Sequence, residues 1–205
     1  MKSVAGYAFE VFIVFLGVYL AFMVTDYQDE VRDRAVRIKY YDSLIFEFGG
    51  LIRHLDGEEA KLRRHLAVVE DIEKGNRPHI PASDLHYVYP AAVVAAAWEG
   101  RNFESLRTQD LRSIISGTPA LTTLEELVRM LNQLSATVLL PAQIASENCC
   151  YRDDGQLREE FAWYPRLVGE IHELNRELRT VVVEQALPDL TSSKETLAEG
   201  GYWPL

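Results

Sequence analysis

The chain has 205 residues, 48% of them apolar, and a formal net charge of −10 at neutral pH. This composition is typical of a folded protein and not of a disordered one. The negative charge argues against nucleic-acid binding, which draws most of its affinity from Lys and Arg on phosphates. The adjacent Cys149 and Cys150 are poorly placed to join distant parts of a fold, so we expect ordinary thiols near a helix end.

Residues 4–24 form an apolar run whose one charged side chain is Glu10. The run is close to the length of about 20 residues that crosses a bilayer core as a helix. A secretory signal peptide would have a shorter apolar run followed by a small-residue cleavage site, whereas the sequence here continues as Phe22-Met23-Val24. The sequence therefore predicts a single, uncleaved transmembrane anchor in residues 1–25.

One face of the predicted anchor combines small residues with its only acid. At about 100° per residue, five positions share a narrow stripe: Gly6, Glu10, Ile13, Gly17 and Ala21. Gly17 and Ala21 are a small-xxx-small pair, which lets another helix approach closely, and acids inside membranes usually face protein. We therefore predict that these five residues form a helix–helix interface, within a homo-oligomer or a larger membrane complex. The alternatives are a Glu10 without a role and a Glu10 on an ion or proton path.

Residues 26–77 are predicted to be a stalk that continues into the first helix of a bundle. Their apolar positions recur with heptad-like spacing, interrupted by Glu59: Ile38, Tyr41, Ile45, Phe48, Ile52, Leu55, Leu62, Leu66 and Val69. Gly49-Gly50 is the expected bend, because glycine weakens a helix interior. We expect the helix to end in "KGNRPHIP", where Gly75 and two prolines stop it.

Residues 78–187 are predicted to complete the bundle, with residues 188–205 as a C-terminal tail. We expect short helices over 91–100 and 108–116, the second closed by Gly117 and Pro119. A capping box at Thr123 predicts a third helix to about residue 146, with a kink at Pro141. A heptad-like seam of apolar residues over 157–187 predicts the last long helix. The predicted fold class is all-α: a transmembrane helix that continues into a long stalk helix, packed into an antiparallel helical bundle.

The sequence offers no catalytic set. It has no phosphate-binding loop, dinucleotide fingerprint, Gly-x-Ser-x-Gly elbow or His-Glu-x-x-His motif, and no histidine follows a Glu by three residues as in di-iron bundles. The best metal-like group is His54, Glu58 and His65, on a stripe shared with Lys61 that we expect to face solvent. We interpret His172 and Glu173 as a pair at the protein surface and not as catalytic residues. We therefore predict no catalytic, cofactor-binding or metal site.

Two blocks of the sequence resemble a family of uncharacterised bacterial single-pass membrane proteins. "FEVFIVFLGVYLAFMVTDYQDEVRDR" is similar to the family's opening, which has an early Glu, a Gly-x-x-x-Ala step and Asn-x-Trp-Asn-Glu. The matching positions are Glu10, Gly17, Ala21, Asp26 and Glu30, with Tyr27 in place of the usual Trp. The second block is similar to a Trp-containing helix with a Gly and a Leu-x-x-x-x-Leu-Arg step, at Trp98, Gly100, Leu106, Leu111 and Arg112. The family lends no catalytic residues.

The resemblance implies a location in the bacterial inner membrane. Counting Lys and Arg around the anchor favours a cytoplasmic bundle, whereas the family favours a periplasmic one, which we adopt as the expectation. The expected function is that of a non-catalytic accessory or scaffold subunit of a membrane protein assembly. The alternatives are a membrane-tethered bundle that senses a small molecule and an enzyme of unrecognised type.

Overall fold

The computed structural model describes residues 4–87, 106–146 and 149–200. Within these ranges the protein is all-α, as predicted, and contains one isolated antiparallel bridge between Tyr151 and Leu157. The helix expected over 91–100, with Trp98, lies outside the described residues, as do the last five residues of the chain.

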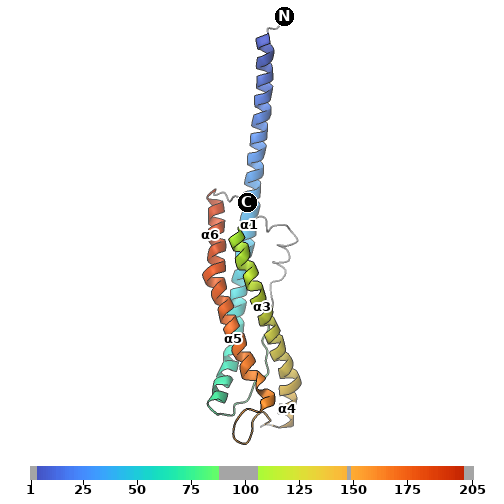
Figure 1. The fold of residues 1–205 in the computed structure, drawn as a ribbon, viewed down its shortest axis with the longest axis vertical. Helices are drawn as coiled ribbons and strands as arrows, with labels where there is room; N and C mark the ends of the chain where they lie inside the picture. The colour runs from blue at the N-terminus through green and yellow to red at the C-terminus, as the bar shows by residue number, and fades with distance from the viewer. Residues whose placement is uncertain (1–3, 88–105, 147–148, 201–205) are drawn as a thin grey trace.

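The longest element is α1, Val4–Glu73, a single helix of 70 residues. Its first part projects alone from the rest of the molecule, and its second part lies inside a bundle (Figure 1). The expected bend at Gly49-Gly50 does not interrupt it, because both residues are helical. The helix ends where the sequence predicted: Gly75 adopts a φ of 80°, and its N–H donates to the carbonyl of Ile72.

Two further rods complete the bundle around the second part of α1. The first rod runs in the same direction as α1 and comprises α3 (Thr108–Leu134), the π-helical η2 (Ser135–Leu139) and α4 (Leu140–Ala145). A 3₁₀ turn, η3 (Glu159–Phe161), precedes the second rod. That rod returns antiparallel to the other two and comprises α5 (Trp163–Val181), the π-helical η4 (Val182–Ala186) and α6 (Leu187–Ala198) (Figure 1).

The predicted break at Gly117 and Pro119 is wrong, because α3 runs through both residues. Proline removes an N–H donor and crowds the preceding turn, yet the helix continues across Pro119, and nearby threonines bond back to helix carbonyls. Thr122 Oγ1 donates to the carbonyl of Thr118 at 3.1 Å, and Thr123 Oγ1 donates to that of Pro119 at 2.9 Å. Thr123 is therefore a residue of the helix interior and not the cap of a new helix.

Two further helical prolines each follow a π-turn. Pro141 comes after η2 and Pro188 after η4, each at the start of the next α-helical stretch. A π-turn widens the helix by one residue, which relieves the clash between a proline ring and the carbonyl one turn earlier. The helices can therefore continue past both prolines.

Residues 187–198 form α6 and are not part of a tail as predicted. Buried positions along the rod continue at spacings of three and four residues beyond Val182, through Ala186, Leu190, Ser193 and Leu197. Leu190 and Leu197 pack with Tyr41 and other buried side chains in a small core near the point where α1 leaves the bundle.

The main core lies lower in the bundle and joins all three rods. Its fully buried members come mainly from α1, α3, α5 and the segment after α1, and include Leu55, Leu62, Leu131, Leu167 and Ile80. These side chains fix the second part of α1 between the two other rods.

Candidate functional site

The predicted interface stripe lies on the projecting part of α1, where no other described residue covers it. Ile13 is 51% exposed, and a Cβ added at Gly17 would meet nothing within 4 Å. Ala21 is also exposed. Gly6 and Glu10 belong to α1, but their side chains lie outside the part of the chain that the structure describes. The three described stripe positions are thus open to a neighbouring helix.

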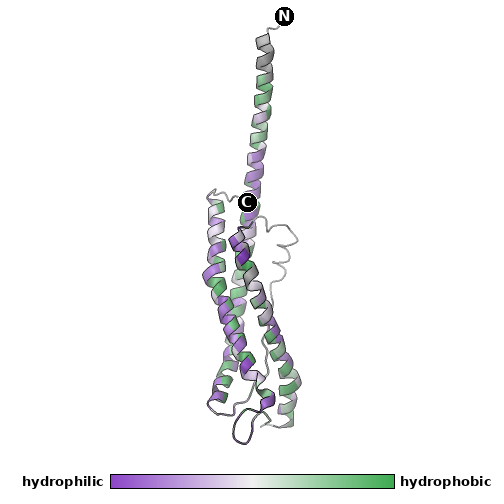
Figure 2. Cartoon of the chain, in the orientation of Figure 1, coloured by the Kyte–Doolittle hydropathy of each residue, from purple (hydrophilic) through white to green (hydrophobic). Residues whose placement is uncertain are grey.

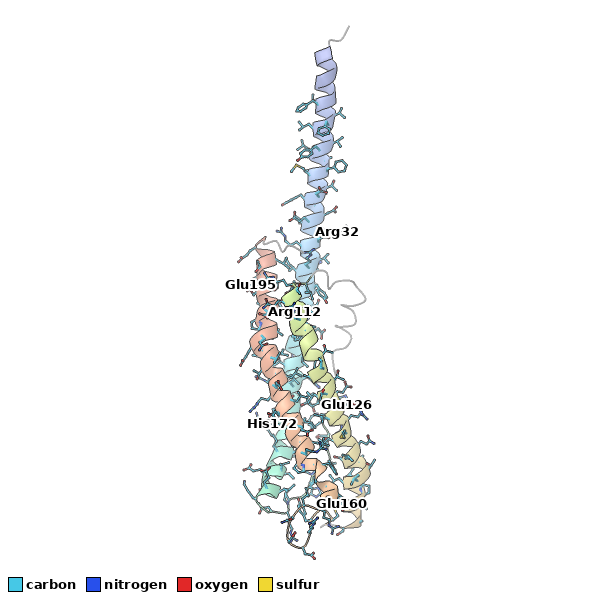
Figure 3. The ribbon with its side chains drawn as sticks, in the orientation of Figure 1. Arg32, Arg112, Glu126, Glu160, His172 and Glu195 are labelled. Carbon is cyan, nitrogen blue, oxygen red and sulfur yellow. The ribbon has the colours of Figure 1, made fainter. Side chains whose placement is uncertain are left out.

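Hydropathy divides the projecting part of α1 into two zones. The first is apolar, and a polar zone follows it before the helix enters the bundle (Figure 2). Among the described residues, α1 is the one helix long and apolar enough to cross a membrane. In the polar zone Arg34 and Glu30 form an ion pair at 3.5 Å, and Arg32 lies just above the bundle (Figure 3).

Four of the five stripe residues, all but Ala21, share a heptad register with the face of α1 that packs inside the bundle. Counting back by sevens from Ile45 gives Ile38, Val31, Val24, Gly17 and Glu10. Counting back by sevens from Tyr41 gives Arg34, Tyr27, Leu20, Ile13 and Gly6. The seam read from the sequence began at Ile38 and missed this continuity, which the seven-residue spacing would have revealed.

Between the apolar segment and the bundle, two apolar residues in this register are exposed. Tyr27 is 67% exposed and Val31 is 44% exposed. A straight α-helix drifts by about 20° per heptad, so four heptads turn the row by about 80° around α1 between Ile45 and Gly17. A helix that contacted Gly17 would therefore approach from another side than α6 does.

The metal-like stripe is not the solvated face that the sequence indicated. Glu58 is 5% exposed and His65 is fully buried, so the predicted exposure of these two residues is wrong. Glu58 accepts hydrogen bonds from Lys61 Nζ at 2.7 Å and from the backbone N–H of His86 at 2.8 Å. This carboxylate holds the segment after α1 against the helix.

His65 and Tyr164 join α1 to α5 inside the core. The Nδ1 atom of His65 lies 3.0 Å from the hydroxyl of Tyr164, and both side chains are fully buried. The Nε2 atom of His65 has no hydrogen-bond partner. Burial lowers the pKa of His65, and the charge of Arg64 adds to this effect, while Asp84 opposes it.

A second set of linked hydrogen bonds connects the segment after α1 with α5 and with α1. Tyr87 donates its hydroxyl proton to Asn175 Oδ1 at 2.8 Å, and Asn175 Nδ2 donates to Glu59 at 3.0 Å. His172 Nδ1 lies 3.3 Å from the same carboxylate, so its partner is Glu59 and not the neighbouring Glu173. Burial is the main cause that raises the pKa of Tyr87, which therefore stays protonated.

Tyr41 and Asp110 form the corresponding polar contact in the upper core. The Tyr41 hydroxyl donates to Asp110 Oδ2 at 2.7 Å, and Asp110 is 2% exposed. The same hydroxyl accepts the backbone N–H of Arg107 at 3.3 Å, just before α3 begins. This contact ties the start of α3 to α1.

The described polar side chains of the bundle therefore connect its elements to one another. Among the described residues, no group of three or more His, Cys, Asp or Glu side chains could hold a metal ion. Trp163 and Tyr164 pack in or against the main core, as expected for large aromatic residues.

No family model, curated protein or solved structure matches the chain. The resemblance to the single-pass membrane family therefore stays a prediction.

Proposed function

We propose that the protein is a non-catalytic accessory or scaffold subunit of a membrane protein assembly. Its apolar segment would pair with another transmembrane helix through Gly6, Glu10, Ile13, Gly17 and Ala21. The observation that carries the proposal is the continuity of α1, which joins an uncovered small-residue surface to a tightly packed bundle without a break. A change of position of the apolar segment would therefore be passed directly to the bundle.

The exposed apolar residues above the bundle support the same interface. Tyr27 and Val31 continue the heptad register of Gly17 beyond the apolar segment. Two helices that pair in a membrane can continue this contact in the adjacent aqueous layer, where burial of Tyr27 and Val31 would stabilise the pair.

The proposal is tested by extracting the full chain in mild detergent and identifying the chains that co-purify, including further copies of itself. Gly17→Leu places a large side chain on the proposed contact surface, whereas Phe15→Leu alters the opposite side of the helix and is the matched control. We expect Gly17→Leu to lose the associated chains and Phe15→Leu to keep them. Extraction as a monomer, or equal association of the two variants, would contradict the proposal.

We further propose that the bundle lies on the periplasmic side of a bacterial inner membrane. Protease added to spheroplasts should then cleave the loop at Gly155, which is half-buried at the end of the bundle far from the apolar segment. Protection of this loop until the membrane is dissolved would place the bundle in the cytoplasm instead.

A further inference from the structure

Cys149 and Cys150 lie at the start of the loop that joins α4 to α5, at the far end of the bundle. Both side chains are buried, at 8% and 4% exposure. Their Sγ atoms lie 3.0 Å apart, so the two thiols are in direct hydrogen-bonding contact. Neither the proposed interface nor the polar contacts between the rods uses them.

The loop that follows is closed by a small set of hydrogen bonds. The backbone N–H of Arg158 donates to the carbonyl of Cys150 at 2.9 Å, and Arg158 Nε donates to that of Tyr151 at 3.1 Å. The Tyr151 hydroxyl donates to the carbonyl of Pro78 at 2.6 Å, which fastens the loop to the segment after α1. Opening the loop therefore means breaking the contact between Tyr151 and Pro78.

Adjacent cysteines can form a disulfide, but only a strained one. Their Cα atoms are about 3.8 Å apart across a trans peptide, whereas disulfides usually join Cα atoms about 4.4–6.8 Å apart. Strained disulfides are easily reduced and are often the labile ones. A bond between Cys149 and Cys150 would therefore be reversible and would not serve as a permanent staple.

We propose that Cys149 and Cys150 are a reversible two-electron modification site, oxidised to an intraloop disulfide by a low-molecular-weight disulfide. One cysteine thiolate attacks the small disulfide, forms a mixed disulfide and releases one small thiolate, which takes up the proton that the cysteine lost. The second cysteine, also as thiolate, attacks the mixed disulfide at the first cysteine's sulfur and displaces the second small thiolate, which takes up the proton that this cysteine lost. Two cysteine thiols are oxidised, and one small disulfide is reduced to two small thiols.

The closed loop controls this exchange. Burial, together with the neighbouring thiol, raises the pKa of Cys150 to about 12, so little of its reactive thiolate is present at neutral pH. Exchange therefore proceeds when the loop opens and water reaches the two sulfurs. A variant that weakens the contact between Tyr151 and Pro78 should accelerate it.

The test uses the reduced full chain in detergent, oxidised glutathione as the small disulfide, and intact-mass measurement. We expect the wild-type protein to lose the mass of two hydrogen atoms and to keep no glutathione. Cys149→Ser and Cys150→Ser should each stop at one glutathione adduct, because the second thiol is missing. Reduced glutathione should restore the wild-type mass. Stable adducts on the wild-type protein, disulfide-linked dimers, or two thiols that persist in the folded chain while urea-unfolded chain is oxidised would overturn the proposal.

Tyr151→Phe tests the role of the loop. This variant should be oxidised about 2- to 10-fold faster than wild type, the factor that one net hydrogen bond contributes to an opening equilibrium. Tyr19→Phe, which alters an exposed tyrosine far from the loop and outside the proposed interface, is the matched control and should react at the wild-type rate. Equal rates for Tyr151→Phe and Tyr19→Phe would show that the loop does not control the exchange.

Discussion

The two parts of α1 carry similar side chains in opposite surroundings. In the bundle, Leu55 and Leu62 are fully buried against the chain's own helices, whereas Phe15 in the projecting part is 70% exposed. The bundle part also carries the polar residues Glu58 and His65 on its packed face, each with a partner from another element. The apolar zone of the projecting part, residues 12–24 among those described, carries no charged side chain, so its surface suits lipid or another helix.

The largest difference between the two parts should appear in core truncations. Leu62→Ala removes a fully buried side chain and should lower the free energy of unfolding by about 2–5 kcal/mol. Phe46→Ala, on the same helix but at a position that is 69% exposed, is the control and should change it little. Urea unfolding of the detergent-solubilised chain, followed by circular dichroism, measures both. Equal losses would mean that α1 is not packed as described.

A smaller effect is expected from the polar contact of the upper core. Tyr41→Phe removes the donor to the buried Asp110 carboxylate and should cost about 1–3 kcal/mol of unfolding free energy. Tyr40→Phe is a closely matched control, because the Tyr40 hydroxyl is buried without a partner and its removal should cost nothing. The same urea titration compares them, and the prediction fails if Tyr40→Phe is the more destabilising change.

The stability of the bundle should depend on pH through His65. The folded-state pKa of His65 lies below its unfolded value of about 6.5, because burial disfavours the charged ring. The stability that the neutral His65 contributes to the folded bundle is therefore fully present above about pH 6.5. It is lost as the pH falls below that value, because the unfolded chain then binds a proton that the folded chain does not. His65→Gln, which does not titrate, should show a smaller loss than wild type between about pH 7.5 and about pH 5. His79→Gln, at an exposed position, should keep the wild-type dependence.

The smallest effect on folding is expected for the exposed residues of α1 that lie between the apolar segment and the bundle. Tyr27→Ala combined with Val31→Ala should leave the free energy of unfolding of the bundle unchanged to within about 0.5 kcal/mol, because both side chains are exposed. The same double variant should reduce co-purification with other chains. If the double variant destabilised the bundle and still associated with other chains as well as wild type, these two residues would belong to the bundle and not to the interface.

Much of the fold could be predicted from the sequence. Helical periodicity identified the all-α class, the long first helix and its end near Gly75. The failures came from local rules that tertiary packing overrides. Pro119 ends an isolated helix, but α3 continues through it because residues on both sides, such as Ile114 and Leu124, are buried against other elements.

The polar residues of the core were harder to predict. The sequence shows Glu58 and His65 on a stripe beside the apolar seam, and their burial follows from partners supplied by distant segments, the N–H of His86 and the hydroxyl of Tyr164. No spacing within α1 reveals these partners. The helical period alone places Gly17 and Ala21 on one face of α1, and their role in an interface stays a prediction.

The continuity of α1 also makes it a lever. Its 70 residues extend for about 105 Å at 1.5 Å per residue. A helix that changes its inclination in a bilayer by about 10° would sweep the far end of such a rod through about 18 Å. Small changes in membrane thickness or in the packing of the apolar segment would thus become large lateral displacements at the loop that carries Cys149 and Cys150.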